Sequence, residues 1–205
     1  ADLVICQKEH RNYYEGKYSS KELSNVYYLG VPLLTEKKDA EKKENNPKVL
    51  LYAGSLFKEI RNPEFIINTF KHCKESVLKI YTPADKKWLG GLVGENKNIL
   101  LFDSVSHEEI ERLSMEADAI LNIGNSYSGA APSKMIESIS YGKPIINTYR
   151  IDNDPCDALL KQYPLSLSLD ERKQDYENSA AEIEKLLCGE YEKISCESLK
   201  KIFYD

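Results

Sequence analysis

The segment with the clearest chemical content is a loop followed by a helix, at residues 126–148, SYSGAAPSKMIESISYGKPIINT. An apolar run ends near Ile123, and small residues then fill the loop, where they let a ligand approach the backbone closely. The predicted helix begins near Pro132, so its free N–H groups and its dipole favour an anion there. Lys134 in the first turn adds a full positive charge. The segment therefore predicts a phosphate-binding site.

Glu137 follows Lys134 by three residues, which places both side chains on one face of the predicted helix. Its carboxylate could accept hydrogen bonds from both hydroxyl groups of a ribose while the phosphates lie at the helix end. The alternative is an ordinary exposed ion pair, which stabilises a helix by about 0.2–0.5 kcal/mol. The spacing alone is compatible with both interpretations.

Short β-rich runs alternate with helical patterns around this segment. The predicted strands are residues 49–53, 77–81, 98–102, 119–123 and 144–148, with 164–169 as an edge strand. Ser106 and Glu109 form a capping box before one of the helices. Repeated strand–helix–strand units predict an α/β fold with a doubly wound parallel sheet. Ligands of such sheets bind at the carboxyl ends of the strands, in the loops after Ala53, Phe102, Ile123 and Thr148.

Composition excludes several classes of protein. The 205 residues carry a net charge of −5, which argues against a nucleic-acid partner because a phosphate backbone requires clustered Lys and Arg. The five cysteines form no CxxC pair, so neither a disulfide framework nor a zinc site is expected. No apolar run reaches the roughly 18 residues of a membrane span, and no signal peptide is evident. A cytoplasmic protein without a bound metal is the expectation.

The stretch PSKMIESISYGKPII resembles the sugar-nucleotide-binding segment of GT-B glycosyltransferases, particularly the large group 1 (glycogen-synthase-like) family. That family places a Glu in the helix and follows it with Gly, Lys or Thr, Pro and a strand. VLLYAGSLFKEIRNPEFIINTF resembles the first strand, glycine loop and helix of the family's C-terminal domain. FDSVSHEEIERLSMEADAILN resembles its base-binding loop, helix and next strand. The resemblance implies a Rossmann-like donor-binding domain.

The resemblance also implies roles for individual residues. It assigns donor-nucleotide binding to Gly54, Ser55, Lys58, Arg61, Ser104, Val105, Ser133, Lys134 and Glu137. It places the donor sugar beside Ser128, Gly129, Ala130 and Ala131. Arg61 and Lys134 are the predicted catalytic residues, because positive charge stabilises a diphosphate leaving group. The substrate would be a nucleoside diphosphate sugar of UDP or GDP type, with no cofactor.

The same resemblance divides the chain into four parts. Residues 1–35 would be the tail end of an N-terminal acceptor domain, 36–47 an exposed polar linker, 48–170 the nucleotide-sugar domain and 171–205 C-terminal helices. The chain opens on a strand-like run without an initiator Met, so we expect it to begin inside a longer protein. The isolated chain is then expected to bind donor nucleotide with negligible turnover.

The implied reaction is sugar transfer to a hydroxyl acceptor, most often in bacterial surface polysaccharide or capsule synthesis. The acceptor would be a glycan or a lipid-linked glycan bound by the other domain, which could also associate with the inner face of the membrane. One position departs from the family, since Gly129 stands where a Glu commonly contacts the donor sugar. A non-catalytic nucleotide-binding or regulatory module of the same fold is therefore the alternative. A receiver-like signalling domain would need an acidic cluster near the chain start, which is absent.

Overall fold

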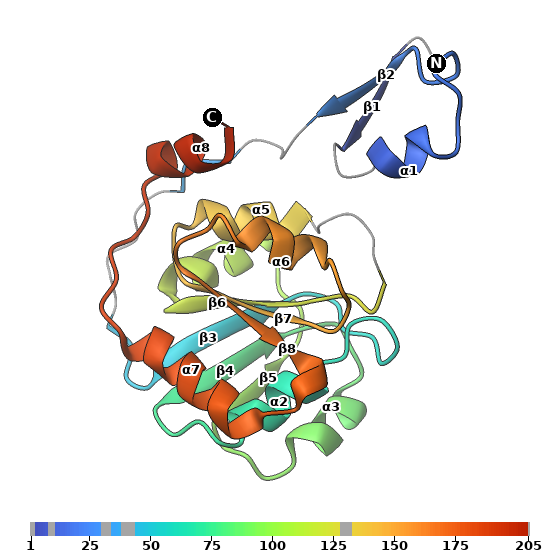
Figure 1. Cartoon of the computed structure of the whole chain (residues 1–205). Helices are drawn as coiled ribbons and strands as arrows, with labels where there is room; N and C mark the ends of the chain where they lie inside the picture. Colours follow the sequence, from blue (N-terminus) through green and yellow to red (C-terminus); the bar gives the residue numbers. More distant parts are fainter. Residues whose placement is uncertain (1–2, 8–10, 30–33, 38–43, 128–132, 205) are drawn as a thin grey trace.

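The main body is a single parallel sheet of six strands (Figure 1). The computed structural model describes residues 3–7, 11–29, 34–37, 44–127 and 133–204. The strands are β3 (Lys48–Ala53), β4 (Ser76–Tyr81), β5 (Ile99–Phe102), β6 (Ala119–Ile123), β7 (Ile145–Tyr149) and β8 (Ser166–Asp170). Their order is β5-β4-β3-β6-β7-β8, and every pair is parallel. The doubly wound parallel sheet is confirmed, with β8 at its edge as predicted.

The chain winds outward in opposite directions from β3 and β6. β4 and β5 extend the sheet on one side of β3, whereas β6, β7 and β8 extend it on the other. Residues Leu50 and Leu51 of β3 pair with Ala119 and Ile120 of β6. The connections after these two strands therefore diverge, which leaves a crevice at their carboxyl ends.

Helices cover both faces of the sheet (Figure 1). One face carries α2 (Glu64–Phe70), α3 (Lys86–Val93) and α7 (Tyr176–Cys188). The other carries α4 (His107–Glu116), α5 (Ser133–Ser140) and α6 (Pro155–Leu160). The last of these was not anticipated, because its Asp-rich start resembles a turn. Asp154 in fact caps α6, accepting hydrogen bonds from the N–H groups of Cys156 and Asp157.

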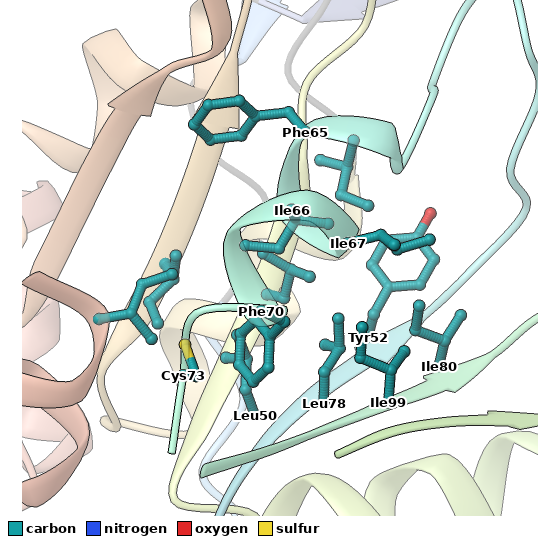
Figure 2. Close-up of a cluster of buried hydrophobic side chains, with 14 of the residues drawn as sticks. Leu50, Tyr52, Phe65, Ile66, Ile67, Phe70, Cys73, Leu78, Ile80 and Ile99 are labelled. Carbon is teal, nitrogen blue, oxygen red and sulfur yellow. The ribbon is translucent and has the colours of Figure 1, made fainter. Parts of the chain in front are cut away.

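The larger hydrophobic core lies between the sheet and α2 (Figure 2). Five residues of α2 are buried, because its apolar positions recur at helical spacing. Leu50 and Leu78 supply fully buried side chains from β3 and β4. Tyr52 of β3 and Leu56 of the loop that follows belong to the same cluster, so α2 packs against this strand and its loop.

The N-terminal residues form a separate small sheet. β1 (Val4–Gln7) and β2 (Val26–Leu29) pair in parallel, with α1 (Arg11–Glu15) between them in sequence. β1 corresponds to the strand-like run on which the chain opens.

The segment between the small sheet and β3 is not wholly exposed. Lys37 is 9% exposed at its side chain, and Asn45 donates hydrogen bonds to the carbonyl oxygen of Glu116 and to Asp118. The expectation of an exposed linker at 36–47 is therefore wrong at these two positions, since tertiary contacts bury polar groups that the composition assigns to solvent.

The C-terminal residues form two helices, as predicted. The first, α7, ends at the capping residue Gly189, and α8 (Cys196–Tyr204) follows. A short 3-10 helix, η2 (Glu171–Lys173), precedes them. Among the described residues, no helix has both the length and the apolar character needed to cross a membrane.

Candidate functional site

A cavity of about 270 Å³ lies at the crevice between β3 and β6. The carboxyl-end residues of both strands form its floor, and the loop glycine Gly54 extends it. Its walls come from two helices on the same face of the sheet, α4 and α5. The cavity therefore occupies the position at which open parallel sheets bind ligands.

One face of α4 and one face of α5 line this cavity. α4 contributes His107, Ile110 and Ser114, and α5 with the turn after it contributes Lys134, Glu137, Ser138 and Tyr141. Each residue has another member of its set three or four positions away, so each set forms one continuous stripe of its helix. Only Ser114 of α4 is buried, and the apolar Ile110 of the same helix lines the cavity.

Arg61 and Lys134 line the same cavity. Lys134 Nζ lies 3.4 Å from the carbonyl oxygen of Ala53, at the end of β3. A Cβ atom on Gly54 would lie 3.8 Å from that nitrogen and 3.1 Å from the hydroxyl of Tyr52. Burial raises the pKa of Tyr52 to about 12, and the nearby Arg61 guanidinium partly offsets this effect. A side chain at Gly54 would thus crowd the Tyr52 hydroxyl, so the glycine leaves the backbone accessible beside the Lys134 ammonium.

The loop that carries Arg61 is fixed to the loop after β6. Arg61 and Phe57 exchange two backbone hydrogen bonds, of 2.9 and 3.1 Å, which close the loop on itself. Asn125 Oδ1 accepts hydrogen bonds from the Arg61 side chain at 2.8 and 3.1 Å. Ser126 donates its N–H to the carbonyl of Ile60 and its hydroxyl to that of Glu59. The arginine is therefore positioned without a ligand.

Glu137 faces the cavity with a carboxylate oxygen that is buried. Its Oε1 atom has no hydrogen-bond partner among the described residues. Two cationic or basic groups lie just beyond hydrogen-bond distance: Lys37 Nζ at 3.8 Å and His107 Nε2 at 3.7 Å. Charge thus attracts the carboxylate, while the acceptor capacity of Oε1 remains unused among the described residues.

The remaining predicted residues divide into three groups. Val105 lines the cavity, whereas Ser55, Lys58 and Ser104 are described but do not line it. The Lys58 ammonium instead lies 5.6 Å from the ring centre of Trp88. Ser133 begins α5. The four residues predicted to contact the donor sugar, Ser128, Gly129, Ala130 and Ala131, lie outside the described residues.

Several lining or supporting residues were not predicted for the site. Asn125, Lys37, His107 and Tyr141 received no assignment to it. The His107 side chain is 72% exposed, yet it lines the cavity. Asn125 directly follows the glycine at the end of β6, a strand-end position that could have indicated it. Nothing in the local sequence around Lys37 indicates its contact with Glu137.

Neither a protein-family model nor a curated protein matches the sequence. Solved structures do match. Sucrose-phosphate synthase from Thermosynechococcus elongatus has a TM-score of 0.65 at 14% identity, covering 99% of this chain and 54% of that one. Anabaena HepE in complex with UDP-glucose has a TM-score of 0.64 at 10% identity, covering 99% and 60%. AviGT4, a glycosyltransferase involved in avilamycin A biosynthesis, has a TM-score of 0.53 at 14% identity, covering 82% and 48%.

The chain thus spans about half the length of the structures it matches. The match extends over nearly the whole chain for two of them. At these identities the likeness shows the fold. The chain therefore has the Rossmann-like fold of these GT-B structures.

Proposed function

We propose that the cavity binds a nucleoside diphosphate sugar, and that the chain is the donor-binding part of an enzyme that transfers the sugar to a hydroxyl acceptor. One observation carries the proposal. Arg61 is distant in sequence from Lys134 and Glu137, yet all three line a single cavity at the carboxyl ends of β3 and β6. Two cations and one carboxylate match the two polar parts of such a donor, its diphosphate and its ribose.

The diphosphate would lie between Arg61, Lys134 and the start of α5. The free N–H groups and the dipole of a helix favour an anion at its N-terminus. Gly54 lets the backbone approach the phosphates, and Val105 lies where the nucleobase would stack or pack. The UDP-glucose bound to the similar HepE structure supports a donor of this class.

The transfer reaction would require positive charge at the diphosphate. In its transition state an oxocarbenium-like sugar separates from the diphosphate leaving group, on which negative charge accumulates. Arg61 and Lys134 are the catalytic residues in this proposal because they would stabilise that charge. The acceptor, a glycan or a lipid-linked glycan, would bind in another domain that closes over the cavity. Polysaccharide or glycoconjugate synthesis at the cytoplasmic side of the membrane is the setting we propose.

Titration calorimetry of the chain with UDP, GDP, UDP-glucose and GDP-mannose tests the proposal. Removing the Lys134 ammonium deletes a charge-assisted contact, so Lys134→Ala should raise the Kd of the preferred nucleotide about 10- to 100-fold. Lys87→Ala is the matched control, because Lys87 is an exposed lysine of α3 that does not line the cavity. Equal binding by wild type and Lys134→Ala would contradict the proposed site.

The sugar dependence of binding separates the proposed enzyme from the alternative function. A donor-binding domain should distinguish a nucleotide sugar from the bare nucleotide and one sugar from another. A non-catalytic nucleotide-binding module should bind nucleotide and nucleotide sugar with the same affinity. The isolated chain should show negligible sugar transfer, measured as release of UDP or GDP in the presence of an acceptor glycan.

A further inference from the structure

A second polar atom of the cavity lacks a partner besides the Glu137 carboxylate. The hydroxyl group of Tyr141 is buried and has no hydrogen-bond partner within the described part of the chain. The residue is only 3% exposed, and it lines the cavity four positions after Glu137. A buried donor and a buried acceptor, both unsatisfied, therefore lie on one stripe of α5 and the turn that ends it.

The Tyr141 hydroxyl lies near the polar side chains of Glu137 and Ser114, which also line the cavity. Burial raises its pKa to about 12, the nearby Glu137 carboxylate acts in the same direction, and the nearby Ser114 hydroxyl acts in the opposite direction. The phenol therefore keeps its proton at neutral pH and can act as a hydrogen-bond donor. Most buried polar groups in proteins have a partner, so an unsatisfied donor beside a cavity indicates a place for a ligand's polar group.

Lys37 holds both side chains in place. Its ammonium donates a 2.7 Å hydrogen bond to Glu111 of α4 and lies 5.1 Å from the ring centre of Tyr141. It is also 3.8 Å from Glu137 Oε1, too long for a hydrogen bond. The lysine thus attracts the carboxylate and covers the ring, but it occupies neither unsatisfied atom.

We propose that Tyr141 is a ligand-binding residue, which together with Glu137 forms hydrogen bonds with two adjacent hydroxyl groups of the ligand. Each hydroxyl of a vicinal diol can donate one hydrogen bond and accept another. A carboxylate can only accept, and the protonated phenol can donate, so the two side chains complement such a diol. The diol in a nucleoside diphosphate is the 2′,3′-diol of its ribose. The inference rests on the proposed function, to which it adds a specificity-determining residue.

The unsatisfied hydroxyl predicts opposite effects on stability and on binding. In the free protein it is a buried donor with no partner among the described residues, so its removal should leave stability unchanged or increase it. In the complex it gains a partner, so its removal should weaken binding. A tyrosine that serves only the fold would show the reverse pattern, with lower stability and unchanged binding.

The test compares Tyr141→Phe with Tyr163→Phe in the whole chain. Tyr163 is also buried, but its hydroxyl donates a 2.7 Å hydrogen bond to the carbonyl of Lys143, and it does not line the cavity. Calorimetry uses UDP, GDP and their 2′,3′-dideoxy analogues. We expect Tyr141→Phe to raise the Kd of the preferred ribonucleotide about 3- to 10-fold and that of its dideoxy analogue less than about 2-fold. Tyr163→Phe should change neither.

Thermal unfolding without nucleotide supplies the second readout. The Tm of Tyr141→Phe should equal or exceed that of the wild type, whereas the Tm of Tyr163→Phe should fall. The inference is overturned if Tyr141→Phe lowers the Tm as Tyr163→Phe does, or if it weakens ribonucleotide and dideoxy analogue equally. A wild-type chain that binds neither UDP nor GDP would refute the proposed function itself, and the inference with it.

Discussion

Arg61 is held by a neutral partner, which distinguishes it from Arg150, another arginine near this edge of the sheet. Its guanidinium donates to the amide oxygen of Asn125, and an amide fixes its geometry without neutralising its charge. Arg150, by contrast, forms a 2.5 Å ion pair with the buried Glu171. The full charge of Arg61 thus remains available to an anion, while Arg150 is neutralised within the fold.

Asn125→Ala tests whether this positioning matters. The substitution removes the acceptor but leaves the arginine, so the side chain must be ordered anew when nucleotide binds. We expect the Kd of the preferred nucleotide to rise about 3- to 10-fold, with a loss of unfolding free energy below about 1 kcal/mol. Calorimetry and urea unfolding measure the two quantities.

A control variant and a double variant complete the test of Asn125→Ala. Asn96→Ala is the control, because Asn96 donates to the carbonyl of Val93 on α3, away from the cavity. In an Arg61→Met background, Asn125→Ala should have no additional effect on affinity. An equal loss in both backgrounds would show that Asn125 acts independently of the arginine.

At the scale of elements, Lys143 connects the two helices that wall the cavity. It follows α5 in sequence, and its ammonium donates hydrogen bonds to the carbonyls of Ser114, Met115 and Ala117 at the end of α4. The last carbonyls of a helix have no partner within the helix, so this lysine caps α4. Lys143→Met should therefore cost about 1–3 kcal/mol of unfolding free energy at pH 7.

The same lysine predicts a pH dependence. Burial lowers the pKa of Lys143 to about 8, whereas lysines of the unfolded chain titrate near 10.4. Between these values the unfolded chain binds more protons than the folded protein, so the unfolding free energy rises with pH in this window. The stability gap between the wild type and Lys143→Met should widen from pH 7 to pH 10 in urea unfolding. A constant gap would contradict the lowered pKa.

Gly142 ends α5 in a conformation that favours glycine. Its φ is +64°, and an added Cβ atom would lie 2.1 Å from the carbonyl oxygen of Ile194. Ile194 also donates its N–H to the carbonyl of Gly142, so the backbones are in direct contact. Gly142→Ala should destabilise the chain by more than about 1 kcal/mol, measured by urea unfolding.

Gly90→Ala is the matched control for this prediction. Gly90 lies within α3, and an added Cβ atom there would meet none of the described residues within 4 Å. Alanine is the better helix former by about 0.8–1 kcal/mol, so this variant should be as stable as the wild type or more so. Opposite signs for the two glycines are the expected outcome, and equal losses would argue against the contact with Ile194.

At the scale of the whole molecule, three distant parts of the sequence meet behind the site. The hydrophobic cluster under α5 contains Leu34 from before the sheet, Ile139 from α5 and Leu199 from α8. Leu199→Ala should therefore cost about 2–5 kcal/mol, because its side chain is fully buried. Leu100→Ala, at a position 37% exposed, should cost much less. Urea unfolding compares them, and similar losses would show that α8 does not contribute to the core.

Local pattern was sufficient for most of the architecture. The strands are recognisable in the sequence as short apolar runs, and β6 was predicted with its observed bounds. The capping box at Ser106 and Glu109 placed the start of α4, where the Ser106 hydroxyl accepts from the N–H of Glu109. These signals depend on only a few neighbouring residues, so they can be recognised without knowledge of the fold. The missed helix α6 shows the limit, since an Asp that caps a helix resembles an Asp in a turn.

The sequence by itself therefore determined the parallel sheet and the strand-end loops, and it singled out Arg61, Lys134 and Glu137 as candidates. Only the tertiary structure decided that these three share one cavity, that Lys58 and Ser104 do not line it, and that Lys37 and Asn125 hold its charged groups. The physical reason is distance along the chain. Lys37 approaches Glu137 across about a hundred residues, and no local propensity or periodicity encodes such a contact.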